Sequence, residues 1–192
     1  NTADLESFAG QWAANQFQSR FVGYEALEAQ ASVLSMVADK KEISSISKGQ
    51  DAVVLLDQTP FYGESGGQVG DIGYLQFEQG SAQVLDTQKI GQDFIAHFIT
   101  VEQGTLKVGQ KLQAHVNEKA RMDAAKNHTA THILHATLKE VLGSHVEQKG
   151  SMVSPERLRF DFAHPTALTA EELVDLEERI NERIWLGDQV QA

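Results

Sequence analysis

Residues 118–142, EKARMDAAKNHTATHILHATLKEVL, decide how the chain divides. This stretch contains neither glycine nor proline and is rich in Ala, Leu, Lys and Glu, which favour the helix more than most residues do. Gly143 follows directly, where a helix is expected to end. The stretch therefore predicts one long helix. The sequence on either side of it differs in composition and in the spacing of its apolar residues.

Upstream, from about residue 21 to residue 116, short β-type runs alternate with Gly, Asp and Gln. Residues 53–56 (VVLL) and 94–99 (FIAHFI) are such runs. Of the 15 glycines, 11 fall between Gly23 and Gly109, as expected where strands turn often. We expect a small antiparallel β-barrel over 21–116.

The first twenty residues have a helical pattern, with Leu5, Phe8 and Trp12 at three- to four-residue spacing. We expect residues 1–20 to form an N-terminal helical segment. The sequence starts without Met or a basic and apolar leader, so we expect a fragment of a longer protein. No apolar run approaches the roughly 20 residues that span a bilayer, and we expect no membrane partner.

Downstream of the long helix, residues 145–153 and 158–162 predict a β-hairpin whose turn contains Ser154-Pro155-Glu156. A capping box at 169–172 predicts a second helix. We expect this helix to lay one apolar face on a sheet. The fold class is therefore α+β: a barrel followed, over 117–192, by a two-layer α+β domain. The expected apolar face consists of Leu173, Leu176, Ile180 and Ile184.

Composition limits the function further. The net charge of −11 argues against a simple nucleic-acid binder, but residues 105–160 carry nine basic and five acidic side chains between two acidic segments. The positive charge of this segment favours local contact with phosphate groups. The alternative is that these side chains form an ordinary solvated surface. The chain has no cysteine, which excludes disulfides, a thiolate zinc cluster and a cysteine nucleophile within it.

The clearest chemical pattern is His128-Thr129-Ala130-Thr131-His132. Residues four apart on a helix lie one turn above each other, so the two imidazoles can share a metal ion. Thr129 stands where a metalloprotease has its glutamate, which excludes that peptidase chemistry. The alternative is that the histidines only pack the helix. A zinc site needs three or four ligands, and further candidates are His135, His145, His164 or a carboxylate.

Residues 63–67 (GESGG) satisfy the G-x-S-x-G pattern, with Ser65 as a possible nucleophile. That motif requires a strand, a sharp turn and then a helix, and residues 68–73 (QVGDIG) cannot continue a helix. We favour a glycine-rich loop whose backbone approaches a ligand or a neighbouring element closely, over a serine esterase or an ordinary loop. Gln148, in the hairpin, can donate to and accept from a small polar substrate, or simply face water.

Four segments in this order resemble the editing region in the middle of alanyl-tRNA synthetases: residues 57–71, 127–132 (NHTATH), 148–151 (QKGS) and 158–162 (LRFDF). The resemblance covers about residues 20–190. In that family, the region hydrolyses the ester that joins a wrongly attached serine or glycine to the alanine tRNA. A second site is useful because a pocket sized for alanine rejects these two amino acids weakly. The implied fold is the editing domain of the threonyl/alanyl type, truncated at its C-terminus.

The resemblance also implies roles for particular residues. His128 and His132 match zinc ligands, Thr131 matches a residue that lines the pocket, and Gln148 matches one that recognises the noncognate amino acid. The loop with Gly66 and Gly67 matches one that reaches the editing site from the barrel. From charge alone, we add three contacts to the acceptor end of tRNA(Ala): Lys126, Lys149 and Arg159.

The family completes its zinc site with a Cys-x-x-x-His pair, which we expect downstream of this chain. We therefore expect weak zinc binding and poor editing here, with the rest of the synthetase, including its ATP-dependent part, as partner in cis in the cytoplasm. Whether zinc activates a water or only orders the site stays open. The alternative function is a non-catalytic tRNA-binding or linker module.

Overall fold

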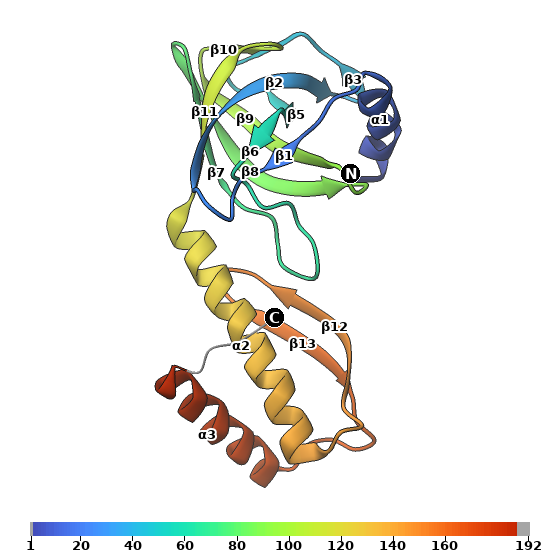
Figure 1. The fold of residues 1–192 in the computed structure, drawn as a ribbon, viewed down its shortest axis with the longest axis vertical. Coiled ribbons are helices and arrows are strands. Elements are labelled where there is room, and N and C mark those ends of the chain that lie inside the picture. Colours follow the sequence, from blue (N-terminus) through green and yellow to red (C-terminus); the bar gives the residue numbers. More distant parts are fainter. Residues whose placement is uncertain (1, 188–192) are drawn as a thin grey trace. The chain divides into compact units, whose positions relative to one another are not determined.

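The computed structural model describes residues 2–187, which form two compact units (Figure 1). The barrel unit comprises the residues up to 65 and residues 69–121, and the second unit comprises residues 66–68 and those from 122 onward. The elements, in chain order, are α1 (Thr2–Ala14), β1 (Arg20–Phe21), β2 (Glu28–Ala38), β3 (Lys41–Glu42), β4 (Ser45–Ser47), β5 (Asp51–Leu56), β6 (Gln58–Thr59), β7 (Gly73–Phe77), β8 (Gly80–Ile90), β9 (Phe94–Gln103), β10 (Thr105–Lys107), β11 (Lys111–Val116), α2 (Glu118–Leu142), β12 (Glu147–Val153), β13 (Leu158–Ala163) and α3 (Ala170–Leu186).

The barrel unit contains a closed antiparallel barrel (Figure 1). Its strands pair in the order β11-β7-β8-β9-β5-β2, and β11 also pairs with β2, which closes the sheet on itself. Closure removes the free edges at which an open sheet would pair with other chains. The predicted α+β class and the small antiparallel barrel are both confirmed.

Alternation along the strands fills the barrel interior. In β11, Leu112, Ala114 and Val116 are buried, while Lys111 and Gln113 face outward. This is the period of two that a sheet imposes on its side chains. The interior cluster includes Val33, Met36, Val54, Leu56, Phe61, Leu75, Ala82 and Leu106.

Helix α1 confirms the predicted N-terminal helix and packs on the barrel with the predicted residues. Leu5, Phe8 and Trp12 are all buried, in one cluster with Phe94. The Trp12 ring meets Phe94 edge-on at 5.4 Å, and its Nε1–H donates to Ser35 Oγ at 3.1 Å. The indole therefore buries a large apolar area while its only donor is satisfied.

His97 is a polar side chain inside the barrel unit, with no exposed surface. Its Nδ1–H donates to the Val54 carbonyl at 3.0 Å, and its Nε2 accepts from the Thr59 hydroxyl at 2.7 Å. Burial lowers the pKa of His97 to about 4. The ring is therefore neutral at physiological pH, and both of its nitrogens are occupied within the core.

The second unit contains the remainder of α2, the β12–β13 hairpin and α3 (Figure 1). The long helix and the hairpin confirm the predictions, and Thr169 and Glu172 form the predicted capping box. A small cluster around Leu138 and Val146 forms the core of this unit. None of the helices described between residues 2 and 187 is both long and apolar enough to cross a membrane.

The predicted apolar face of α3 is only partly correct. Leu176 is 5% exposed, but Leu173 and Ile184 are more than half exposed. Within residues 2–187, one hairpin and one neighbouring helix offer too little apolar surface to cover the whole stripe. Arg183 instead joins α3 to α2 through polar contacts, with its Nη2 2.8 Å from the Glu140 carboxylate.

Candidate functional site

The base of the glycine-rich loop is held within the barrel unit. The Tyr62 amide donates to the Asp71 carboxylate at 2.7 Å, and the Asp71 amide donates to the Tyr62 carbonyl at 2.9 Å. Asp71 also forms an ion pair with Arg121, which donates to the carbonyls of Gly23 and Pro60 as well. The Asp71 side chain is 5% exposed. No sequence pattern predicted this pair, because its members are 50 residues apart and acquire partners only in the fold.

The tip of the loop belongs to the second unit. Gly66 and Gly67 have φ angles of +59° and +85°, in the left-handed region that favours glycine. The Gly67 carbonyl accepts from the Val153 amide at 2.7 Å, and Gln68 forms a parallel bridge with the same residue. No helix follows Ser65 in the described chain until α2, so the context that a serine hydrolase elbow requires is missing. The prediction of a glycine-rich loop is correct.

Gln148 lies where the hairpin register breaks. Gln148 pairs with Phe162 but Gly150 pairs with Asp161, so Lys149 is an extra residue on β12. Such bulges re-aim side chains and are frequent beside functional sites. The Gln148 amide donates to Ser151 Oγ at 3.1 Å.

Ser151 links this amide to the loop tip. A Cβ added to Gly67 would lie 2.6 Å from Ser151 Oγ and 2.7 Å from its carbonyl oxygen, so only glycine allows this approach. The structure therefore brings Gly67, Gln148 and Ser151 together. Ser151 stands inside the QKGS segment, but no local pattern marks it as a site residue.

The two histidines of α2 lie face to face, as their spacing predicted. The His128 and His132 rings are 5.0 Å apart between centroids and 16° from parallel. His128 Nδ1 is 2.8 Å from Gln68 Oε1 at the loop tip. Burial, and to a lesser extent the neighbouring His132, lower the pKa of His128. This ring is consequently biased toward the neutral form that binds metals.

Thr131 lies on the same helix and is buried. Its hydroxyl donates to the Asn127 carbonyl at 2.8 Å, one turn earlier. The Asn127 amide donates to the Ser154 carbonyl at 2.8 Å, which ties α2 to the hairpin turn. The Thr131 oxygen keeps its acceptor capacity, but its proton is already used within the helix.

The three basic residues predicted to contact tRNA are exposed, and each has a carboxylate beside it. Their side chains are 57% to 71% exposed. The pairs are Lys126 with Asp123 at 3.6 Å, Lys149 with Glu147 at 2.9 Å, and Arg159 with Asp161 at 3.1 Å. Within residues 2–187, no contact described joins them to the histidine pair.

The chemistry of the histidine pair fits zinc in kind, with imidazole nitrogens on adjacent helical turns. It does not fit in number, because residues 2–187 contain no group of three or more ligands. His145 and His164 contact each other instead, with Nε2 and Nδ1 3.0 Å apart, and His135 lies beside Phe160. Among residues 2–187, none of the candidate residues forms a three-ligand group with His128 and His132.

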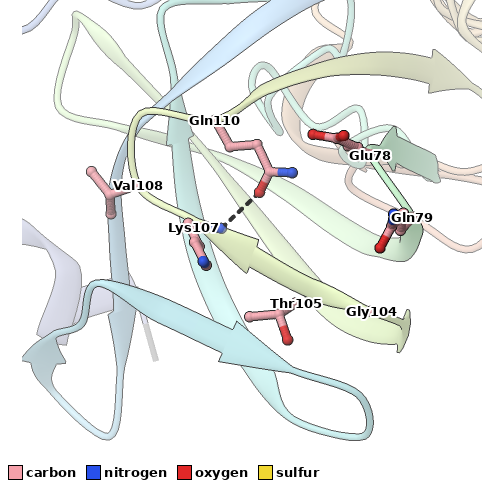
Figure 2. Close-up of a pocket in the computed structure, with 7 residues that line it drawn as sticks. All are labelled: Glu78, Gln79, Gly104, Thr105, Lys107, Val108 and Gln110. Atoms are coloured by element: carbon pink, nitrogen blue, oxygen red, sulfur yellow. Dashed lines mark hydrogen bonds between the residues drawn. The ribbon is translucent and has the colours of Figure 1, made fainter.

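A hollow in the barrel unit, shown in Figure 2, contains none of the predicted site residues. Its titratable side chains are Glu78 and Lys107, and the Gln110 side chain accepts from the Lys107 amide at 3.1 Å. This hollow has neither a histidine nor a buried charge, so the second unit holds the better candidate site.

Residues 3–120 match the family model described as tRNA synthetases class II (A). The chain belongs to this family. Its relatives include proteins named alanine–tRNA ligase, which confirms the resemblance to alanyl-tRNA synthetases. The one from Haemophilus influenzae is 49% identical over 175 residues, 91% of this chain and 20% of that protein.

Two further alanine–tRNA ligases give similar values. The Alkaliphilus oremlandii protein is 44% identical over 177 residues, 92% of this chain and 20% of that protein. The Rhizobium meliloti protein is 49% identical over 164 residues, 85% of this chain and 18% of that protein. The chain thus spans about a fifth of the length of the curated relatives it matches.

Proposed function

We propose that this chain carries the editing region of an alanine–tRNA ligase, where the ester that joins a wrongly attached serine or glycine to tRNA(Ala) is hydrolysed. One observation carries the proposal: the second unit groups the tip of the glycine-rich loop, the stacked pair His128 and His132, and the Gln148–Ser151 contact. The relatives named alanine–tRNA ligase support the parent activity.

His128 and His132 would hold zinc, together with ligands outside residues 2–187. Bound zinc supplies a Lewis acid that can polarise an ester carbonyl or a water molecule. Within the chain, the lowered pKa of His128 favours the neutral form of that ring, and Gln68 contacts its Nδ1. The protein groups are therefore positioned before any metal or substrate arrives.

The amino acid attached to the tRNA would be recognised by three polar side chains, those of Gln148, Ser151 and Thr131. An amide side chain both donates and accepts, which suits the hydroxyl of serine, and Thr131 offers a remaining acceptor beside its methyl group. A site built to hydrogen-bond a hydroxyl strongly rejects the analogue that lacks one. We therefore expect seryl-tRNA(Ala) to be hydrolysed in preference to alanyl-tRNA(Ala). Hydrolysis of glycyl-tRNA(Ala) rests on the resemblance to the family and not on this hydrogen bonding, because glycine also lacks a hydroxyl.

Lys126, Lys149 and Arg159 would contact the acceptor end of the tRNA. Because each is exposed and paired with a carboxylate, phosphate would have to replace that partner. Binding should consequently weaken steeply as salt rises. The rest of the synthetase would act in cis, in the cytoplasm.

The test is deacylation of seryl-, glycyl- and alanyl-tRNA(Ala) by a chain that continues beyond Ala192 through the expected Cys-x-x-x-His pair. Seryl- and glycyl-tRNA should be hydrolysed, and alanyl-tRNA should remain intact. A Ser65→Ala variant should keep the parent rate, because Ser65 lacks the context of a nucleophile. Equal hydrolysis of all three substrates, or loss of activity in Ser65→Ala, would contradict the proposal.

A non-catalytic tRNA-binding or linker module is the second candidate for this chain. It is favoured by one observation, the lack of a three-ligand group within residues 2–187. Such a module should bind tRNA equally well with His128→Ala and should show no deacylation in either form. Measuring both quantities on the same two proteins separates the candidates.

A further inference from the structure

Gln68 faces His128 with an atom that can only accept a hydrogen bond. Its Oε1 lies 2.8 Å from His128 Nδ1, and the Gln68 residue is 8% exposed. A carbonyl oxygen carries no proton, so Nδ1 must carry the one that is shared. In a neutral ring, the other nitrogen, Nε2, is then left with a free lone pair.

The backbone at Gly67 and Gln68 is anchored to Val153 of β12. Gly66 and Gly67 take left-handed conformations, and the Gly67 carbonyl accepts from the Val153 amide at 2.7 Å. Gln68 itself bridges to Val153. The side chain therefore starts from an anchored position and reaches His128 without a mobile loop between them. Gly67 allows the loop to approach β12, because a Cβ at this position would collide with Ser151.

We propose that Gln68 is a positioning residue: it holds His128 in the tautomer with a proton on Nδ1, so that Nε2 is the nitrogen available for a metal ion or a substrate. A histidine side chain in water favours the opposite tautomer, with its proton on Nε2. The contact with Gln68 must therefore reverse this intrinsic preference. The tautomer follows from this chain's own residues, and its use for zinc-dependent editing rests on the function proposed above.

The tautomer can be observed directly by ¹⁵N–¹H NMR of the histidine rings in the metal-free chain at alkaline pH. Two variants make the test specific. Gln68→Met removes the acceptor at similar volume, and Gln68→Glu retains an acceptor. The parent and Gln68→Glu should show the proton of His128 on Nδ1, while Gln68→Met should shift it toward Nε2.

Two other sites serve as controls for an intact fold. His97 should keep its proton on Nδ1 in every variant, because the Val54 carbonyl fixes it. The contacting pair His145 and His164 should keep its signals unchanged. A proton on Nε2 of His128 in the parent, or an unchanged tautomer in Gln68→Met, would overturn the proposal.

Zinc affinity gives a second readout, measured by titration of the chain extended beyond Ala192. Loss of a partner behind a ligating histidine typically weakens metal binding roughly 10–100-fold, so Gln68→Met should bind less tightly and Gln68→Glu should not. The failures are distinguishable. The expected tautomer without zinc binding or deacylation would refute the proposed function and leave the role of Gln68 intact. Deacylation by a parent chain that has the His128 proton on Nε2 would refute the role of Gln68 and leave the proposed function intact.

Discussion

His97 in the barrel unit and His128 in the second unit show that the two units use the same side chain differently. His97 is fully buried, and both of its nitrogens contact partners in the core. His128 is half-buried, and its Nδ1 contacts Gln68 while its ring faces His132. A histidine with hydrogen-bond partners at both ring nitrogens stabilises the core. A histidine with a partner at one nitrogen keeps the other nitrogen available to bind a metal or a substrate.

The surroundings of the two histidines follow the same division. The barrel is closed and its interior cluster is large, while the cluster described in the second unit centres on Leu138, Val146 and Leu176. The second unit also leaves much of the apolar face of α3 exposed. The barrel unit therefore has the larger apolar core, and the second unit holds the histidine pair of the proposed site on a smaller core.

Asp71→Ala should have the largest effect, because it leaves the partly buried Arg121 guanidinium without its carboxylate partner. Breaking a buried ion pair typically lowers the free energy of unfolding by about 3–5 kcal/mol. The matched control is Asp161→Ala, which removes the partner of exposed Arg159 and should cost about 1 kcal/mol or less. Urea unfolding of the two variants measures both values, and equal losses would contradict the contrast between the units.

Acid should destabilise the barrel unit through His97. Its pKa falls from the usual 6.5 to about 4 on folding, so the unfolded chain takes up a proton that the folded core refuses. The stabilisation is complete above pH 6.5 and is lost as the pH falls from 6.5 to about 4, by about 3 kcal/mol in total. Unfolding of the parent should show this slope, and a His97→Gln variant should be less stable at neutral pH with a shallower slope. Identical slopes would count against a neutral buried ring.

The two loop glycines should differ in how they respond to alanine. Gly66→Ala meets no atom within 4 Å and carries only the backbone strain of a left-handed residue, about 1–2 kcal/mol. Gly67→Ala adds a collision with Ser151. Histidine NMR should therefore show His128 disturbed more by Gly67→Ala than by Gly66→Ala. The reverse order would mean that the loop tip does not approach β12 as described.

Ile184→Ser should have the smallest effect, because this side chain of α3 is already more than half exposed. Exposed substitutions usually change stability by about 0.5 kcal/mol or less. Leu176→Ala is the buried comparison on the same helix and should cost about 2–3 kcal/mol. Thermal unfolding distinguishes the two, and a large loss in Ile184→Ser would show that the stripe is covered.

Local patterns explain what the sequence could predict. The Gly-free stretch of α2, the capping box at Thr169 and the β-type runs at 53–56 and 94–99 depend on neighbours in the chain, and each gave the correct element. The His128–His132 pairing was predictable for the same reason, since helical spacing alone sets it.

Contacts between distant segments were not predictable in this way. Gln68 and His128 are 60 residues apart, and Asp71 and Arg121 are 50 apart. The bulge at Lys149, which sets the register of Gln148, depends on how β12 pairs with β13. The exposed face of α3 was misjudged because an apolar stripe predicts burial without showing how much surface is available to cover it.

The most direct test of the editing site is the His128→Ala variant of the chain extended beyond Ala192, measured for deacylation of seryl-tRNA(Ala) and for thermal unfolding. If His128 belongs to the working site of the second unit, the variant should lose at least about 100-fold in rate, the scale of one catalytic group, while its unfolding temperature stays close to that of the parent. Full activity in His128→Ala, or a loss of activity that only follows unfolding, would contradict the assignment.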